Sequence, residues 1–345
     1  MSRRNAKALW AKAVAVWLAV LLLAGCAGRS TGAPRQPVAS PTPETEPQRP
    51  EPTPAPTESP ATVHAKTKRG MTYGSVALLS EPTVLVSVYA ETPRGEGWDE
   101  AAVAHTQKEL RCAVDWLEKQ AAEYGVQTTL YCDDGTAATA DLRCMVELGN
   151  IVAGGEDSDE SDALLLELDT WCAELDTEAL RSAYGVENVG FLYFLPVAGC
   201  SFTMVHYEED GQDFYHEYSC LYRYDATTPG KPEETATVYA HEILHLFGAP
   251  DLYPGSPDPF VTDALCDYVQ TSYPDEIMYD TMGEGNAVVY SQIDKYISPM
   301  VAYRLGLVQS CPELTLFPAL GDWMPGVFGL GEEAQELLPP GTVAV

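Results

Sequence analysis

Two periods of apolar and polar positions predict the secondary structure from residue 84 onward. Short runs rich in Val and aromatic residues predict strands at 84–89, 126–132, 189–197, 202–207 and 215–224. Apolar residues at helical spacing predict helices at 99–124, 163–184, 233–247 and 290–305. We expect Asp176 to break the second of these helices, and Pro299 must kink or split the last one.

The order of these elements predicts an α/β fold. The strand–helix–strand succession over 84–132 is typical of a parallel pair joined by a crossover helix. The two later strands, 202–207 and 215–224, alternate in the manner of a hairpin and would be antiparallel. A mixed sheet with helices packed on it follows from this order.

The first 25 residues predict a signal peptide and not part of the fold. Four basic residues precede an apolar run at 13–23, and the following string Leu23-Ala24-Gly25-Cys26 resembles a bacterial lipobox. Lipid on Cys26 would anchor the chain by burying methylenes, each worth about 0.8 kcal/mol. The alternative is a short transmembrane helix with an incidental cysteine. Both readings place the bulk of the chain outside the cytoplasm, at the outer face of a bacterial membrane.

Residues 26–68 predict a tether. They are rich in Pro, Thr, Ser and Glu and carry almost nothing large and apolar, so they cannot bury enough surface to offset chain entropy. We expect this segment to be extended and disordered. A folded domain then spans 69–310, which is long enough to bury its own core, and a C-terminal tail spans 311–345.

The charge balance excludes some partners. The chain carries 20 Lys and Arg against 51 Asp and Glu, a net charge of −31. Four of the basic residues precede Cys26, which leaves 16 and a net charge of −35 for the mature chain. Such a chain lacks the basic surface that nucleic acids and anionic lipids require, so we expect no nucleic-acid partner and attachment to the membrane only through Cys26.

The cysteines suggest disulfides. Besides Cys26 there are eight, an even number that allows up to four bridges in an exported domain. Cys200 and Cys220 flank the predicted hairpin and are the one pair that we expect to be joined. No Cys-x-x-Cys spacing is present, which disfavours a zinc ribbon or a thioredoxin-type site.

The segment with the clearest chemistry is His241-Glu242-Ile243-Leu244-His245, inside the helix predicted at 233–247. Positions four apart share one helix face, so the two imidazoles can bind one metal ion. Zinc, Zn2+, suits neutral imidazole and lowers the pKa of a bound water. Glu242 can take a proton from that water, as the general base of a hydrolase.

A third metal ligand must come from elsewhere, because no histidine follows His245. Gly248 can end the helix in a left-handed conformation and turn the chain back, which favours Asp251 as the ligand. Asp251 could instead be an ordinary turn residue. A later segment would then supply the ligand, with Asp263, Asp267 or Glu276 as the choices.

The run from His241 to Asp251 resembles the metzincin metallopeptidases, whose signature is His-Glu-x-x-His-x-x-Gly-x-x-His/Asp. The Asp form is similar to snapalysin and to the immune inhibitor A peptidases. The resemblance implies a metzincin-like catalytic domain with an active-site helix, a Met-turn and a C-terminal helix. Met278, in Glu276-Ile277-Met278-Tyr279, would be the hydrophobic floor of the site.

The resemblance also implies that an edge strand before the active helix binds the substrate as an added strand, with 202–207 or 215–224 as the candidates. One departure is Asp280, where several metzincins have a tyrosine, and we expect Tyr279 to point away from the metal. The specific motifs cover 241–251 and 276–279 only. We therefore expect a lipid-anchored zinc endopeptidase, with a peptide or protein substrate. The alternatives are a surface lipoprotein that zinc only stabilises, or one that binds a solute without metal.

Overall fold

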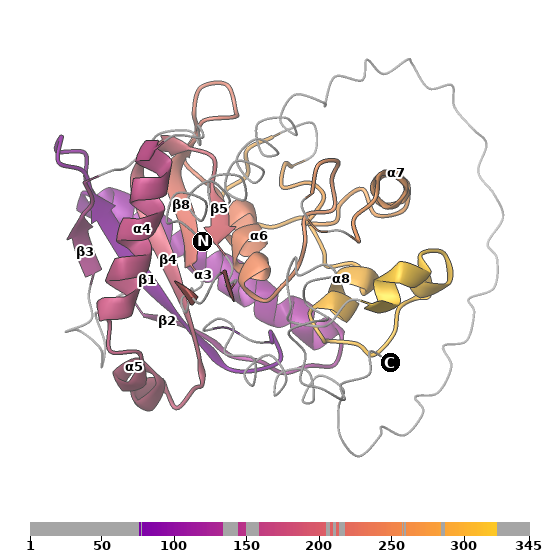
Figure 1. Cartoon of the computed structure of the whole chain (residues 1–345). Coiled ribbons are helices and arrows are strands. Elements are labelled where there is room, and N and C mark those ends of the chain that lie inside the picture. Colours follow the sequence, from indigo (N-terminus) through magenta and orange to yellow (C-terminus); the bar gives the residue numbers. More distant parts are fainter. Residues whose placement is uncertain are drawn as a thin grey trace.

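A six-stranded, mainly parallel sheet forms the centre of the fold (Figure 1). The computed structural model describes residues 76, 78–133, 144–149, 159–204, 208–209, 212–213, 218–256, 258, 260–283 and 287–322. The predicted signal peptide, Cys26, the tether and the part of the tail beyond residue 322 lie outside the described residues. None of the helices within the described ranges is long and apolar enough to span a membrane.

Three long parallel strands make the middle of the sheet: β1 (Thr83–Glu91), β4 (Asn188–Gly199) and β8 (Tyr218–Asp225). Beside β1 lie two short parallel strands, β2 (Leu130–Asp133) and β3 (Cys144–Glu147). The parallel pairing of β1 and β2 confirms the order predicted for 84–132.

The opposite edge of the sheet is β5 (Phe202–Met204), which runs antiparallel to β8. The segment between them carries a separate small hairpin of β6 (Glu208–Glu209) and β7 (Gln212–Asp213). The predicted α/β class with a mixed sheet is therefore confirmed.

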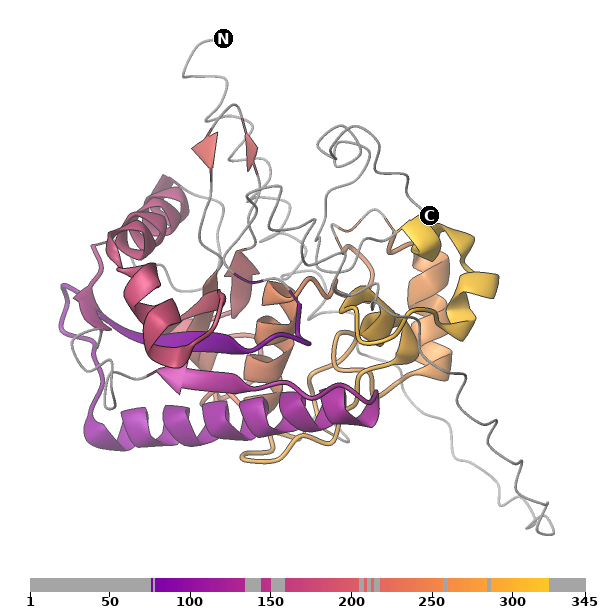
Figure 2. The ribbon, with the colours of Figure 1, turned by 90° about the horizontal axis from the view of Figure 1, so that it is seen from below.

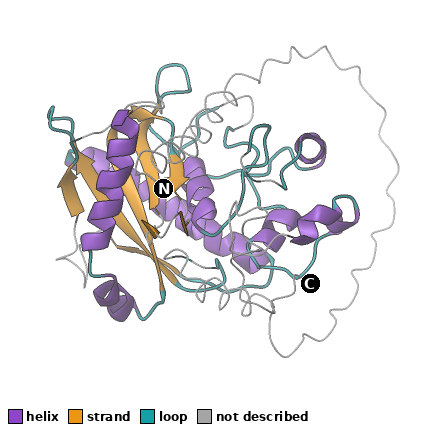
Figure 3. Cartoon of the chain, in the orientation of Figure 1, coloured by secondary structure: helices purple, strands orange, loops and turns teal. Residues whose placement is uncertain are grey.

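Helices cover both faces of this sheet, which makes three layers (Figures 2 and 3). On one face lie α4 (Asp159–Glu174) and α5 (Thr177–Tyr184), whose leucines pack against Val84, Val86 and Val88 of β1. The other face carries α3 (Glu100–Glu123) and α6 (Ala236–Leu246), which pack against Leu85 and Tyr89 of the same strand. The alternation of side chains along β1 thus supplies two cores, one on each face.

Side-chain caps explain where the helices begin. Asp99 Oδ1 accepts a hydrogen bond of 2.8 Å from the Ala102 amide at the start of α3. Asp176 Oδ1 accepts one of 3.0 Å from the Ala179 amide at the start of α5. A cap satisfies an amide that has no partner inside the helix, and here the second cap separates α4 from α5. The predicted break at Asp176 is therefore confirmed.

The C-terminal region differs from the prediction for 290–305. Only α8 (Pro299–Arg304) is helical there. Pro299 is the first helical residue, where a missing amide proton costs nothing, and the Ser298 hydroxyl caps Val301. The preceding residues form no helix: Tyr296 pairs with Glu276, and the Ile297 amide donates to Gln120 of α3. The helix predicted for 290–298 is wrong because residues distant in the sequence, and not the preceding turn, accept hydrogen bonds from its amides.

Two segments that lack a predicted element contain helices. The first, α7 (Asp263–Ser272), lies within a stretch rich in Pro, Gly and Asp. The second segment follows α8 and holds the 3-10 helices η3 (Pro312–Thr315) and η4 (Pro318–Asp322). Cys311 and Leu320 of this segment are buried in the same core as α3 and α6.

The expected disulfide between Cys200 and Cys220 is not formed, and both residues carry free thiols. The register of the β5–β8 pair explains this result. Cys220 lies opposite Phe202, while Cys200 precedes β5 in the turn from β4. The two residues are therefore not cross-strand partners, and this pairing prediction is wrong.

Candidate metal centre

The helix that carries the motif, α6, is fixed at its N-terminus by its own cap and by a side chain of α3. The Thr235 hydroxyl accepts from the Val238 amide and caps the helix. Glu109, a fully buried residue of α3, accepts from the Ala236 amide at 3.2 Å and from the Ser291 amide at 2.7 Å. The bonds to Val238 and Ala236 satisfy amides at the helix start that would otherwise lack partners.

His241 and His245 lie on one face of α6, as their spacing predicts, and both are buried. His241 Nδ1 is 3.0 Å from the Ile277 carbonyl oxygen, and His245 Nδ1 is 2.7 Å from that of Ala249. A carbonyl can only accept, so each Nδ1 carries a proton. The Nε2 atoms, 3.2 Å apart, are then the lone-pair atoms available to a metal.

Asp251 reaches the same point because the chain reverses after α6. Gly248 has φ 93°, a left-handed conformation that favours glycine and ends the helix. Its carbonyl oxygen accepts from Arg304 Nε at 2.8 Å, and the Leu252 amide donates to the Met278 carbonyl at 2.8 Å. Bonds on both sides of Asp251 thereby direct its carboxylate back to the histidines.

The three ligand atoms fit a tetrahedral metal ion. Asp251 Oδ1 lies 3.2 Å from His241 Nε2 and 3.3 Å from His245 Nε2. Zinc bonds of about 2.0–2.1 Å in a tetrahedron place neighbouring ligand atoms about 3.3 Å apart. Among the described residues, the buried Oδ1 has no hydrogen-bond partner besides these two contacts with the imidazoles. His241, His245 and Asp251 therefore form a buried group that could hold a metal ion.

The charges at this site favour a cation. Burial alone lowers the pKa of the His241 imidazole, but the Asp251 and Glu242 carboxylates outweigh that effect and raise it to about 9. Burial alone raises the pKa of Asp251, but the two imidazoles outweigh it and hold that pKa well below its usual range. Without a metal, a proton on the His241 imidazole supplies the positive charge, and a metal must displace it.

Glu242 lies beside this group and is only 3% exposed. Thr203, on the edge strand β5, donates to Glu242 Oε2 at 2.8 Å. Burial raises the pKa of Glu242, and His241, His245 and the Thr203 bond offset part of that rise. A carboxylate held in this way next to a metal site can accept a proton at neutral pH and return it.

The turn from Glu276 to Tyr279 contacts α6 at the site and orients one of its histidines. The Tyr279 amide donates to the Glu276 carbonyl at 3.0 Å, and the Ile277 carbonyl is the acceptor that orients His241. Met278, which follows it, is fully buried in the core. Tyr279 lines the same cavity as His241, and its hydroxyl is hydrogen-bonded to Gln270 of α7.

The alternative third ligands do not join the group in the described structure. Asp263 and Asp267 are exposed on α7. Glu276 is fully buried, but its carboxylate accepts hydrogen bonds from the Met278 and Ser298 amides and serves the turn. Only Asp251 comes together with the two histidines.

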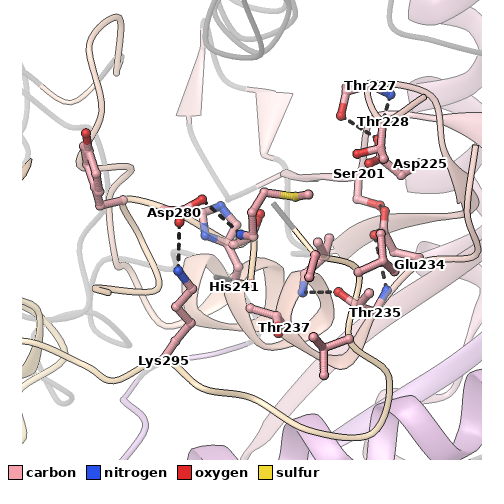
Figure 4. Close-up of a pocket in the computed structure, with 18 of the residues that line it drawn as sticks. Ser201, Asp225, Thr227, Thr228, Glu234, Thr235, Thr237, His241, Asp280 and Lys295 are labelled. Atoms are coloured by element: carbon pink, nitrogen blue, oxygen red, sulfur yellow. Dashed lines mark hydrogen bonds and ion pairs between the residues drawn. The ribbon is translucent and has the colours of Figure 1, made fainter. Parts of the chain in front are cut away.

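The group opens into a cavity of about 700 Å3 that His241 and Glu242 both line. In Figure 4, Thr237 lies beside His241 on the same helix, and Asp280 and Lys295 form an ion pair nearby. Tyr253 also lines the cavity, and its hydroxyl interacts with the Asp251 carboxylate. A substrate that reaches the metal group would therefore bind in this cavity.

Sequence reasoning did not find two residues that complete the site, Thr203 and Tyr253. Thr203 is 39 positions from Glu242, and only the pairing of β5 with β8 brings it to α6. Tyr253 is two residues after Asp251, but nothing in the sequence separates it from the other tyrosines of its segment.

Comparisons with known proteins found no match. No protein-family model, no curated protein and no solved structure is similar to this chain at a significant level. The site geometry and the motif residues therefore carry the functional argument.

Proposed function

We propose that this protein is a zinc-dependent metallopeptidase of metzincin type, an endopeptidase anchored to the outside of a bacterial membrane by lipid on Cys26. The observation that carries the proposal is the convergence of His241, His245 and Asp251 at 3.2–3.3 Å, with Glu242 following the first ligand. The distances suit zinc, whose preferred ligands are imidazole, thiolate and carboxylate.

The residues of the chain have separable roles in peptide hydrolysis. His241, His245 and Asp251 would hold the ion. When bound, zinc polarises the scissile carbonyl and makes a water more acidic. Glu242 accepts the proton of the attacking water and delivers it to the leaving amine, and Thr203 holds its carboxylate in place through the 2.8 Å bond.

The edge strand supports a peptide as the substrate. β5 is at the end of the strand order, and Thr203 of this strand contacts both the carboxylate and the carbonyl of Glu242. A substrate in extended conformation could add to such a strand through main-chain hydrogen bonds. This arrangement would place its scissile bond next to Glu242.

The test compares the full chain with Glu242→Ala, which leaves all three ligands in place. We expect both proteins to hold one zinc ion, and only the parent to cleave casein. Zinc in both proteins without cleavage by either would favour a structural zinc site. Absence of zinc from both would favour a binding protein without metal.

A further inference from the structure

The cavity at the metal centre is strongly acidic. Six carboxylates besides Glu242 line it: Asp225, Glu233, Glu234, Asp267, Asp280 and Asp294. An acidic surface alone would only reflect the net charge of −31. These residues, however, line the same cavity as His241 and Glu242, so a substrate bound at the metal group lies in a cavity with negatively charged sides.

Two of the carboxylates have a cationic partner. Lys295 Nζ lies 2.8 Å from Asp280, and Arg223 lies 3.2 Å from Glu233. Within the described part of the chain, no Lys, Arg or His forms an ion pair with Asp225 or Glu234. These two residues lie on the side of the cavity opposite Asp280 and Lys295 (Figure 4).

Glu234 is the more buried of the two, at 5% exposure. It precedes Thr235, the cap of α6, and its amide donates to the Arg223 carbonyl at 2.9 Å. In the described part of the chain, its carboxylate is bound by neutral groups only, the Ser201 hydroxyl at 3.2 Å and the Thr235 amide at 3.3 Å. Asp225, at the end of β8, is held by the amide and hydroxyl of Thr227 at 2.7 and 2.6 Å.

A buried carboxyl without a cation is unfavourable in its charged form. Burial, and then the charge of Asp225, raise the pKa of Glu234 to about 8. A positively charged side chain in the cavity would offset both effects and would form charge-assisted hydrogen bonds with the carboxylates. The side of the cavity that carries Glu234 and Asp225 is thus better suited to a basic ligand than to a neutral or acidic one.

We propose that Glu234 and Asp225 form a subsite that binds an arginine or lysine side chain of the peptide substrate. This inference rests on the proposed peptidase function, because it takes the cavity as the peptide-binding cleft. On the opposite side of the cavity, the ion pair with Lys295 offsets the charge of Asp280.

A purely structural role for Glu234 is the competing explanation, since its carboxylate links the turn before β5 to the start of α6. Glu234→Gln separates the two roles. The amide oxygen of glutamine can still accept from Ser201 or Thr235, but it carries no charge. A structural role predicts equal effects of this substitution on all substrates, whereas the subsite predicts an effect on basic substrates only.

The experiment uses the zinc-loaded full chain, above the pKa of about 8 of Glu234 so that its carboxyl is ionised. Quenched peptides that contain a single arginine are compared with matched peptides that contain norleucine at the same position. We expect the parent to prefer the arginine peptides by about 10- to 100-fold in kcat/KM. Glu234→Gln and Asp225→Asn should each reduce this preference by about tenfold or more. The exposed control Glu174→Gln should preserve it.

A second readout does not need cleavage. Labelled arginine and norleucine peptides are bound to the Glu242→Ala protein and to its Glu234→Gln derivative, and their Kd values are measured. Tighter binding of the arginine peptide that is lost with Glu234→Gln supports the subsite even if the parent cleaves nothing. Cleavage without preference for a basic residue overturns the subsite and leaves the peptidase function standing. Absence of both a preference in cleavage and a difference in Kd also overturns it.

Discussion

The Thr203 hydroxyl lies 2.8 Å from Oε2 of Glu242 and 2.9 Å from the carbonyl oxygen of the same residue. One side chain thus joins the edge strand β5 to the residue that we propose as the general base. Ser219 of β8 lies 2.8 Å from the same hydroxyl and orders it further. The position of the base is therefore set by the sheet as well as by its own helix.

The first prediction concerns this contact. Thr203→Val removes the hydroxyl and keeps the side-chain shape, so Glu242 loses a bond worth about 1.5–3 kcal/mol. We expect kcat for peptide cleavage to fall about 10- to 100-fold while zinc content and KM change little.

Thr203→Ser is the matched control, because it keeps the hydroxyl. Kinetics and metal analysis of the two variants check the prediction. Full kcat in Thr203→Val would show that this bond does not orient the base.

The second prediction concerns the third ligand. Asp251→Asn keeps the shape but removes the charge that balances a divalent cation, so we expect zinc affinity to fall by more than about 100-fold. Competition with a chromophoric chelator measures the affinity. Asp267→Asn changes an exposed carboxylate of the same cavity and should bind zinc like the parent. Equal affinity in Asp251→Asn and the parent would remove Asp251 from the ligand set.

The third prediction concerns the buried pair of Arg304 and Asp258, whose atoms lie 3.4 Å apart. Arg304→Met removes the cation next to a carboxylate that is 2% exposed, which should lower the free energy of unfolding by about 3–5 kcal/mol. The Gly248 carbonyl also loses its donor, so the turn that leads to Asp251 should loosen and zinc affinity should fall.

Chemical denaturation with and without zinc measures both effects of Arg304→Met. The double variant with Asp258→Asn should recover part of the stability, because no charge is then left unpaired. It should not recover zinc affinity, since the bond to Gly248 is still missing. Unchanged zinc affinity in both variants would show that Arg304 does not position Asp251.

The fourth prediction concerns pH. Burial raises the pKa of Glu234 to about 8 and that of Glu276 to about 7, above the ordinary value of 4.5. The native state therefore binds more protons than the unfolded chain from about pH 4.5 up to these raised pKa values. The contribution of these two groups to the free energy of unfolding is therefore fully present below about pH 4.5. It is lost as the pH rises through 7 and 8.

Urea unfolding of the metal-free protein over this pH range measures the trend. Glu234→Gln does not titrate, so its stability should decline less steeply than that of the parent. The free energies of the two proteins should therefore move closer together, or cross, as the pH rises. A difference that is constant with pH would contradict the raised pKa of Glu234.

The local part of the site could be predicted from the sequence. His241, Glu242 and His245 lie on one helix, and Gly248 and Asp251 follow within six residues of it, so their geometry depends mainly on helix periodicity and one turn. Residues from distant elements could not be predicted. Glu109, Thr203 and Glu234 reach α6 only through helix packing and strand pairing.

The fold shows the same division. The strands around β1 and the crossover α3 have clear periodicity and an identifiable cap at Asp99, and their order could be predicted. The segment at 290–298 has helical apolar spacing but forms no helix. The reason is tertiary: the Ile297 amide bonds Gln120, and that of Ser298 bonds the carboxylate of the buried Glu276. Such long-range partners override local preference.

The most direct test of the central claim is a zinc titration of peptidase activity. Metal is removed from the full chain with a chelator, zinc is added back in fractions of an equivalent, and cleavage of casein is followed for the parent and for Glu242→Gln. We predict that parent activity rises linearly and saturates at one equivalent, while Glu242→Gln binds the same zinc and remains inactive. Activity that is independent of zinc, or equal in the two proteins, would contradict the account.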